Sequence, residues 1–288
     1  MSFFERRGGN FHQLPLAASQ WSADRINGAA VAGLAAHVVE HEHSEGDELT
    51  PARFTIDIFR QGRFEETSVT TTRVRTGRNV RIADALIAQG DQPIARAPAV
   101  FARPSREPSG RRWNPPTGSY VPPGRLRAAM STPGICWGSD AHGESWSLMM
   151  SEHQNASRKR LWINQTGLVN GEESSPFVRT AMVGELTNTL TSWGDTGIGY
   201  INHDVTIVLA RMPAGLSIGL EADNHTSGAG LAVGTSSLYD EFGRFGSCSV
   251  SSLAYLTGSL DVTGAPSQEE WGARQPGTGR DDLSNVTK

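Results

Sequence analysis

Apolar residues recur at helical spacing in two separate segments of the chain. In residues 27–40, NGAAVAGLAAHVVE, nearly every side of a helix would be apolar, and Asn27 is a suitable N-terminal cap. In residues 178–191, VRTAMVGELTNTLT, apolar side chains recur at every fourth position, after a capping serine and first-turn proline, Ser175-Pro176. The pattern predicts two helices, each too apolar to lie anywhere except against a sheet.

Strand-like segments follow each predicted helix. TIDIFR at residues 55–60 is repeated as TIVLAR at residues 206–211, an offset of 151 that also relates the two helices. Gly77 and Gly228 are related by the same offset, and each precedes a stretch of β-type residues that contains one glycine turn. The sequence therefore predicts one unit, made of a helix, a strand and further antiparallel strands, present twice.

These repeats divide the chain into two folded parts. We expect an α+β protein with a first unit at residues 1–103, a proline-rich linker at 104–144, a second unit at 145–260 and a flexible tail at 261–288. A single unit would leave sheet edges that need a partner, so we expect the two sheets to join edge to edge. The same need is compatible with further association into a homo-oligomer.

The composition narrows the classes of partner. The 288 residues are 37% hydrophobic with a formal net charge of −4, and no dense basic stripe indicates a nucleic-acid partner. Because no apolar run has the length of a signal peptide or a membrane helix, we expect a cytoplasmic protein without a membrane partner. In a reducing compartment, Cys136 and Cys248 are expected to be free thiols.

Short motifs in both repeats resemble those of a known enzyme family. QWSADRINGAAVAGLAAHV and FTIDIFRQG in the first repeat, and HDVTIVLARMPAG and LYDEFGRFGS in the second, are similar to motifs of the TesB-like acyl-CoA thioesterases, a thioesterase-like superfamily common in actinobacteria. The resemblance covers roughly residues 10–103 and 145–257. It implies a double hotdog fold, an acyl-CoA substrate in fatty acid metabolism, and hydrolysis to free fatty acid and CoA without a cofactor or a metal.

Thioester hydrolysis by an activated water requires a polarised carbonyl and a group that accepts the proton of the water. The N–H groups at the start of a buried helix can hold the developing oxyanion. The resemblance places the catalytic aspartate at Asp204, seven residues before Arg211. It places a second catalytic position at Thr226 or, with a slip of one residue, at His225, where an imidazole could itself be the base.

The third position of the family departs from its pattern. The resemblance places a glutamine that holds the attacking water at the position of Ser251, and serine is shorter and lacks an amide. The alternative hypothesis is therefore a protein that binds an acyl thioester without hydrolysing it. A hotdog hydratase is a more remote alternative. Each of these candidates could instead be a polar residue without a catalytic role, in a loop or on the solvent-facing side of a strand.

Two further patterns bear on the site. HVVEH at residues 37–41 has the spacing of a zinc-peptidase motif, but it ends an apolar helix, where histidine is favoured by the helix dipole alone, so we expect no metal there. The offset of 151 relates Asp204 to Arg53 and Thr226 to Arg75. An arginine stays protonated and cannot be a general base, so we expect the chemistry to depend on the second repeat.

Overall fold

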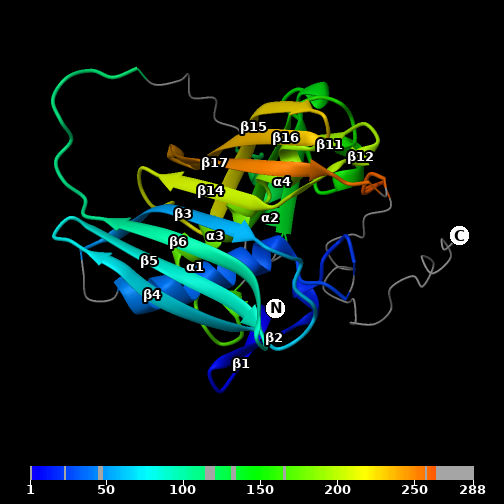
Figure 1. Ribbon diagram of the computed structural model, residues 1–288. Helices are drawn as coiled ribbons and strands as arrows, with labels where there is room; N and C mark the ends of the chain where they lie inside the picture. Colours follow the sequence, from blue (N-terminus) through cyan, green and yellow to red (C-terminus); the bar gives the residue numbers. More distant parts are fainter. Residues whose placement is uncertain are drawn as a thin grey trace, which may run out of the picture.

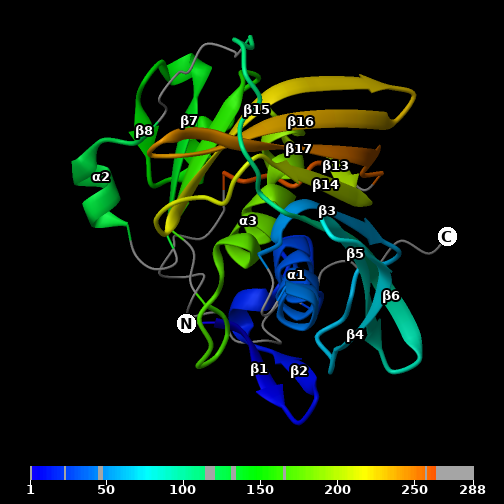
Figure 2. The same cartoon turned by 90° about the vertical axis from the view of Figure 1, so that its left-hand side faces the viewer.

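A long antiparallel sheet with two central helices on one face organises the molecule (Figure 1). The computed structural model describes residues 2–22, 24–44, 48–113, 121–130, 134–164, 167–256 and 258–263. Within these ranges the main sheet has 12 strands, in the order β4-β5-β6-β3-β14-β17-β16-β15-β9-β7-β8, with β13 paired to β17 off this path. The turned view shows both helices on the same side of the sheet (Figure 2).

The first half of the sheet wraps one long helix. Its elements are α1 (Gly28–Ser44), β3 (Thr50–Ile58), β4 (Ser68–Thr76), β5 (Val80–Gln89) and β6 (Gln92–Ala102). The side chain of Asn27 caps α1, because its Oδ1 accepts a hydrogen bond of 2.7 Å from the N–H of Ala30. The β5–β6 hairpin turns at Gly90, whose φ of 56° favours glycine.

The second half repeats this arrangement with a shorter, broken helix. Its elements are α3 (Pro176–Glu185), α4 (Thr187–Thr191), β13 (Tyr200–Asn202), β14 (Asp204–Leu209), β15 (Ser217–Gly228), β16 (Leu231–Asp240) and β17 (Gly243–Ala254). The predicted cap is confirmed, since Ser175 Oγ accepts a hydrogen bond of 3.1 Å from the N–H of Val178. The predicted helix is interrupted at Leu186, and the residues beyond it hydrogen-bond to the sheet, as in the contact of 2.7 Å between Thr187 and Ser236.

The two halves share the sheet through β3 and β14. These strands pair antiparallel over five residues, from the Asp204–Asp57 pair to the Val208–Arg53 pair. The sheets therefore join edge to edge, and the double hotdog fold is confirmed. Each half provides the neighbour that the other half's edge strand lacks.

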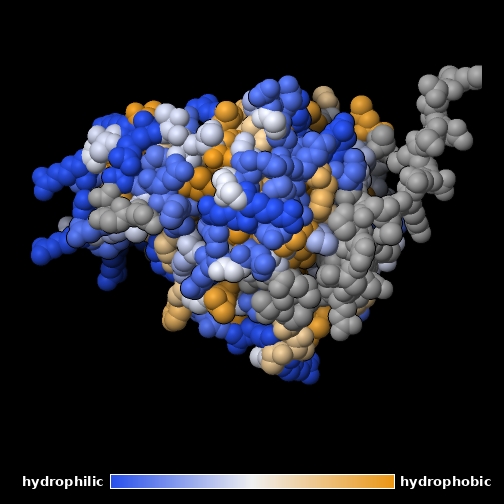
Figure 3. Space-filling model, turned by 90° about the horizontal axis from the view of Figure 1, so that it is seen from below, coloured by the Kyte–Doolittle hydropathy of each residue, from blue (hydrophilic) through white to orange (hydrophobic). Residues whose placement is uncertain are grey.

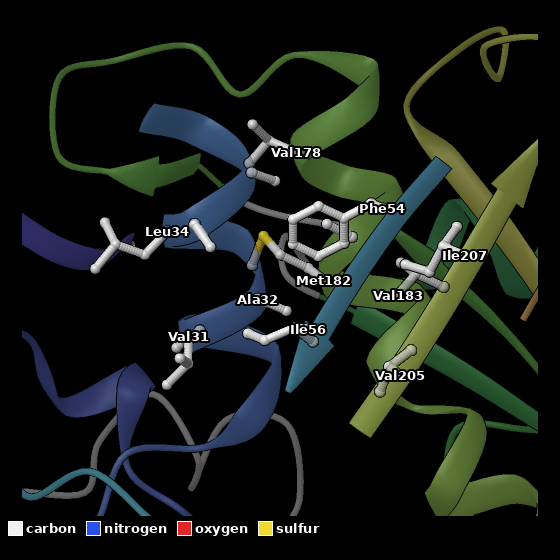
Figure 4. Packing of buried hydrophobic residues seen from close by; sticks show 14 of the residues in the cluster. Val31, Ala32, Leu34, Phe54, Ile56, Val178, Met182, Val183, Val205 and Ile207 are labelled. Atoms are coloured by element: carbon white, nitrogen blue, oxygen red, sulfur yellow. The ribbon is translucent and has the colours of Figure 1, made fainter. Parts of the chain in front are cut away.

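The hydrophobic core lies between this seam and the helices (Figure 4). Phe54 and Ile56 on β3 and Val205 and Ile207 on β14 point from the two central strands toward α1 and α3. The alternate residues of both strands therefore face away from the helices. Gly33 allows the helices to approach closely, because a Cβ there would lie 2.6 Å from Cγ of Met182.

An ion pair joins two of the motifs that carried the resemblance. Arg211, which follows β14, donates hydrogen bonds of 2.6 and 2.8 Å to the two carboxylate oxygens of Asp240 at the end of β16. The Asp240 side chain is fully buried. Burial would raise the pKa of Asp240, but the Arg211 guanidinium and the N–H groups of Ala214 and Phe242 outweigh it and lower the pKa. The pair fixes the loop after β14 to the β16–β17 turn.

The remaining elements lie around the sheet. They are β1 (Ser2–Arg7), β2 (Asn10–Gln13), β7 (Gly134–Ser139), β8 (Trp146–Ser147), β9 (Lys159–Asn164), β10 (Gly167–Val169), β11 (Trp193–Gly194), β12 (Gly197–Ile198), α2 (Gly124–Ala129) and three 3₁₀ turns at Pro15–Ala17, Asp140–His142 and Met150–His153. β1 pairs in parallel with β10, so the first residues of the chain contact the second half.

The expected linker differs from the structure. Residues 104–113 are irregular, but α2 and β7 lie within the segment 104–144, and β7 is a sheet strand paired with β9. The apolar run of Ile135, Cys136 and Trp137 explains the strand, and the surrounding prolines obscured it in the sequence. In the expected tail, Val262 is buried and its N–H donates to Gln154, while residues 264–288 lie outside the described residues.

The surface agrees with the modest net charge. The face drawn in Figure 3 is mainly hydrophilic, with hydrophobic side chains in small separate groups. None of the helices in the described ranges is both long enough and apolar enough to cross a membrane. Cys136 and Cys248 are both buried free thiols.

Candidate active site

Asp204 and Ser251 lie together at one end of the sheet. Ser251 donates a backbone hydrogen bond of 2.7 Å and a hydroxyl hydrogen bond to the same oxygen, Oδ1, of Asp204. His203 completes the group, with its Nε2 2.9 Å from Ser251 Oγ. Both β13 and β14 pair with β17, but their registers differ by one residue, so His203 and Asp204 together oppose Ser251 in a β-bulge. The bulge turns both side chains toward the serine.

Thr226 lies in the same row of the sheet as this group. Its partner on β16 is Val233, and the partner of Val233 on β17 is Ser251. Directly paired residues face the same side of a sheet, so Thr226, Ser251 and Asp204 all point away from the helices. Thr226 and Ser251 are separated by one strand, which corresponds to roughly 10 Å between their backbones. We call these three residues the outer row.

The length of the Ser251 side chain decides what the outer row can do. A glutamine at this position could extend across Val233 toward Thr226, whereas the serine hydroxyl donates to its immediate neighbour, Asp204. Thr226 makes no contact with Asp204 that would let the two act on one water. The outer row therefore holds a carboxylate that accepts two hydrogen bonds from one serine.

His225 lies on the opposite face from the outer row. It pairs with Gly234, where a Cβ would meet the side chain of Thr191 on α4, so this row faces the helices. The His225 ring packs against Tyr200 with centroids 5.8 Å apart. Both residues line a pocket of about 590 Å³ beside α4, β11 and β12. Of the two alternatives, only Thr226 shares a face with Asp204.

The N-terminus of α1 lies on the helix-bearing face, next to groups from the second half. The N–H groups of Gly28 and Ala29 have no hydrogen-bond acceptor among the described residues, whereas Ala30 and Val31 donate to Asn27. Glu185, the last residue of α3, occupies the space beside Gly28, since a Cβ on this glycine would lie 2.0 Å from Glu185 Oε1. The free end of α1 therefore faces a carboxyl group of the other half.

The Glu185 carboxyl group accepts one hydrogen bond, and its burial changes its pKa. The side-chain amide of Asn202 donates to Oε1 over 3.2 Å, and Oε2 has no hydrogen-bond partner among the described residues. Burial raises the pKa of Glu185 to about 7, although the Asn202 hydrogen bond lowers it. The residue as a whole is partly exposed.

The other helix N-terminus has a related but closed arrangement. Ser175, the cap of α3, donates its hydroxyl to Oε2 of Glu40, near the end of α1. The same hydroxyl accepts from the N–H of Val178, so both partners are satisfied locally. Burial raises the pKa of Glu40, and the Ser175 hydrogen bond lowers it. Each half thus directs a glutamate to the N-terminus of the other half's helix.

The remaining sequence candidates are placed as follows. Arg53 and Arg75, at the offset positions of Asp204 and Thr226, lie on β3 and β4 and are exposed. In the HVVEH segment, His37 contacts a carboxylate oxygen of Glu172 at 3.0 Å. No group of three or more His, Cys, Asp or Glu side chains that could hold a metal ion is found in the described ranges.

Sequence reasoning missed three residues of this region. His203 directly precedes Asp204, but a bulge that brings both to one serine depends on the register of two strands. Glu185 could have been noticed as the one acidic residue in the apolar segment 178–191. Asn202 could not, because its contact with Glu185 follows only from the packing of α3 on the sheet.

Comparisons with known proteins agree with this architecture. Residues 17–102 match the family described as acyl-CoA thioesterase N-terminal domain. The tesB protein of Mycobacterium avium subsp. paratuberculosis is 16% identical, with a TM-score of 0.62 over 88% of this chain and 96% of that chain. The acyl-CoA thioesterase II TesB2 of Mycobacterium marinum is 14% identical, with a TM-score of 0.59 over 88% and 94%.

A protein of Alicyclobacillus acidocaldarius, described as having a hot dog fold, is 12% identical with a TM-score of 0.57 over 88% of this chain and 95% of that chain. At these identities the structural likeness concerns the fold. The comparison with curated proteins finds no significant match. Residues 17–102 are therefore similar to the acyl-CoA thioesterase N-terminal domain, and the chain as a whole has the double hotdog fold.

Proposed function

We propose that this protein hydrolyses an acyl-CoA thioester to a free fatty acid and CoA by activating a water molecule. The observation that carries the proposal is the match of residues 17–102 to an acyl-CoA thioesterase domain, in a chain whose second half brings Asp204, Ser251 and Thr226 into one row. The resemblance assigns proton acceptance from the water to Asp204. His225, on the other face, lines a separate pocket.

The required chemistry can be stated without a cofactor. The water oxygen attacks the carbonyl carbon, the carbonyl oxygen becomes an oxyanion, and the C–S bond breaks as the thiolate of CoA leaves with the bonding pair. A carboxylate accepts the proton of the water, and N–H donors stabilise the oxyanion. Removing one oxyanion donor typically lowers kcat by about 100-fold to 1,000-fold. Hydrolysis of fatty acyl-CoA in the cytoplasm is the setting we propose.

The test is release of free thiol from acyl-CoA esters of short, medium and long chain by the purified full chain. We expect turnover of one chain-length class, with kcat lowered about 100-fold or more in Asp204→Asn. Arg53→Ala is the matched control at the offset position on β3, where we expect kcat within about twofold of the wild type and, at most, a raised KM. Equal turnover by Asp204→Asn would remove Asp204 from the mechanism.

A second candidate function follows from Ser251. Because its hydroxyl donates to Asp204 and serine lacks the amide of the family's glutamine, the protein could bind an acyl thioester without efficient hydrolysis. Calorimetry with acyl-CoA and thiol release on the same sample distinguish the two functions. Heat of binding without thiol release identifies the binding protein, and the absence of both signals contradicts both functions.

A further inference from the structure

The pocket of about 590 Å³ beside α4 has no part in the chemistry proposed above. Its walls are formed by the second half alone, from the segment before β9, the end of α4 with β11 and β12, and residues 222–225 of β15. β11 and β12 lie beside this part of β15 (Figure 1). A cavity of this volume is in the range that holds a small organic ligand, so the pocket is large enough for an acyl group.

The pocket lies along an open edge of β15. This strand pairs with β9 only from Ser217 to Glu221, so the residues beyond Glu221 have β16 on one side and no strand on the other within the described ranges. Asn224 and His225 both line the pocket although they face opposite sides of the sheet, and Asn224 shares the face of Thr226. A molecule in the pocket can therefore extend around this edge to the outer row.

The lining of the pocket is too polar to suit a saturated chain. Six lining residues carry a hydroxyl group: Ser157, Thr191, Ser192, Thr196, Tyr200 and Ser259. Among the described lining residues, Leu190 is the one aliphatic side chain larger than alanine. A saturated chain would displace water from the polar groups without replacing its hydrogen bonds, which opposes binding. The lining therefore favours an acyl group that carries an oxygen atom.

The charged side chains of the lining are already paired. Arg158 contacts Oε1 of Glu221 at 2.8 Å and Oδ2 of Asp140 at 3.0 Å. Asp223 lies 3.9 Å from the guanidinium of Arg244. Because neither charge is left unbalanced, the pocket offers no specific partner for a carboxylate or a phosphate. An uncharged oxygen, such as that of a hydroxyl group, fits this environment better.

Three lining side chains have hydrogen-bonding groups that are available to a ligand. Trp193 is 4% exposed, and its Nε1–H has no hydrogen-bond partner in the part of the chain that the structure describes. The Tyr200 hydroxyl and the ring nitrogens of His225 have none there either, and these two rings pack edge to face. A ligand hydroxyl can accept a hydrogen bond from one of these groups and donate one to another.

We propose that this pocket selects acyl groups that carry a hydroxyl group away from the thioester, and that Trp193, Tyr200 and His225 recognise this hydroxyl. The inference rests on the proposed function and names the class of its substrate. The thioester lies at the outer row, and the acyl chain passes around the open edge of β15 into the pocket. The three residues determine specificity and take no part in bond breaking, so their loss should affect one class of substrate only.

The experiment measures thiol release by the purified full chain from two acyl-CoA esters of equal chain length, one saturated and one with a hydroxyl group at the chain end. We expect the wild-type kcat/KM to be about tenfold higher for the hydroxylated ester, the equivalent of one hydrogen bond. Trp193→Phe and Tyr200→Phe each remove one donor and keep a ring. Each should lower the preference about fivefold through a raised KM for the hydroxylated ester, with the saturated ester unaffected.

Trp162→Phe is the matched control. The Nε1 of Trp162 is also buried without a partner among the residues described, but it lies in a separate cluster with Cys136 and Tyr239. Its removal should leave the preference for the hydroxylated ester equal to that of the wild type. A lost preference in this control would show that removing any buried indole N–H disturbs the pocket, which would contradict recognition by Trp193.

Equal kcat/KM of the wild type for both esters would overturn the inference and leave thioester hydrolysis intact. An equal loss on both esters in Trp193→Phe and Tyr200→Phe would also overturn it, since these side chains would then be structural. No thiol release from either ester overturns the proposed function itself. Calorimetry with the same two esters then decides the inference for a binding protein: tighter binding of the hydroxylated ester, weakened in both variants, supports it, and equal Kd values contradict it.

Discussion

Thr55 and Thr206, which are 151 residues apart in the sequence, face each other across the seam between β3 and β14 with their hydroxyl oxygens 3.0 Å apart. The two residues are equivalent positions of the repeated unit. An equivalent pair in contact lies on the axis that relates the two halves, so the offset read from the sequence has a direct structural counterpart. The free energy with which the two repeated units interact can therefore be measured by changing residues of this seam.

The hydroxyl pair should couple the two halves measurably. We expect Thr55→Val and Thr206→Val to show a coupling free energy of about 0.5 to 1 kcal/mol in a double-mutant cycle of urea unfolding. The reason is that each single variant leaves one partly buried hydroxyl without its partner, whereas the double variant leaves none. Strictly additive effects would indicate that the hydroxyls do not interact in solution.

Ser251→Gln tests the limited reach of the serine. We expect this variant to raise kcat about tenfold. A change of this size corresponds to one additional hydrogen bond to the attacking water. A glutamine can extend past Val233 toward Thr226 and release the hydroxyl bond to Asp204. Ser249→Gln, two residues earlier on the same face of β17, is the control and should leave kcat unchanged. A fall in kcat for Ser251→Gln would show that the Ser251–Asp204 contact is itself required.

Glu185 should make the free energy of unfolding depend on pH. Its folded pKa of about 7 is raised above the usual value of 4.5, so the folded state binds more protons between these values. The stability contribution is therefore fully present at low pH and is lost as the pH rises through about 7, with a total on the order of 3 kcal/mol. Urea unfolding should show Glu185→Gln gaining stability over wild type as the pH rises.

Glu107→Gln, at an exposed position, is the control for this measurement. Its stability difference from wild type should stay near zero at every pH. A constant difference between Glu185→Gln and wild type from pH 4 to 8 would contradict the raised pKa of about 7.

The Arg211–Asp240 pair should dominate the stability of the second half. Arg211→Ala leaves the buried carboxylate of Asp240 without its bidentate partner, and we expect a loss of about 3 to 5 kcal/mol in urea unfolding. Arg211→Ala combined with Asp240→Ala should cost less than the sum of the single changes. An additive result would mean that the two side chains stabilise the fold independently.

The fold was predictable because its signals are local and repeated. The apolar segments 27–40 and 178–191 become α1 and α3–α4, and the strand at residues 206–211 becomes β14 with its alternation intact. The seam followed from the need to cover sheet edges. β7 was missed because a six-residue apolar strand among prolines has no periodic signal of its own.

The site was predictable only in part. The family resemblance identified Asp204 and Ser251 as candidates, and the structure shows that the register of β14 and β17 brings the two residues together. His225 and Thr226 are neighbours on one strand and therefore face opposite sides of the sheet. A β-bulge between Ala222 and Asn224 shifts the register by one residue, so the sequence alone does not predict which of the two faces Asp204. Glu185 meets Gly28 through the crossing of two helices from different halves, a geometry that neither segment encodes alone.

The pairing of β3 with β14 also sets an order of events during synthesis. β3 leaves the ribosome well before β14, and in that interval the first half can form its own strands and helix while one edge of its sheet stays open. The open edge can pair with the same edge of another nascent chain, which would exchange halves between two molecules. The second half therefore protects the open edge of the first half from pairing with other chains. Because both halves belong to one chain, β14 is present at high local concentration near β3.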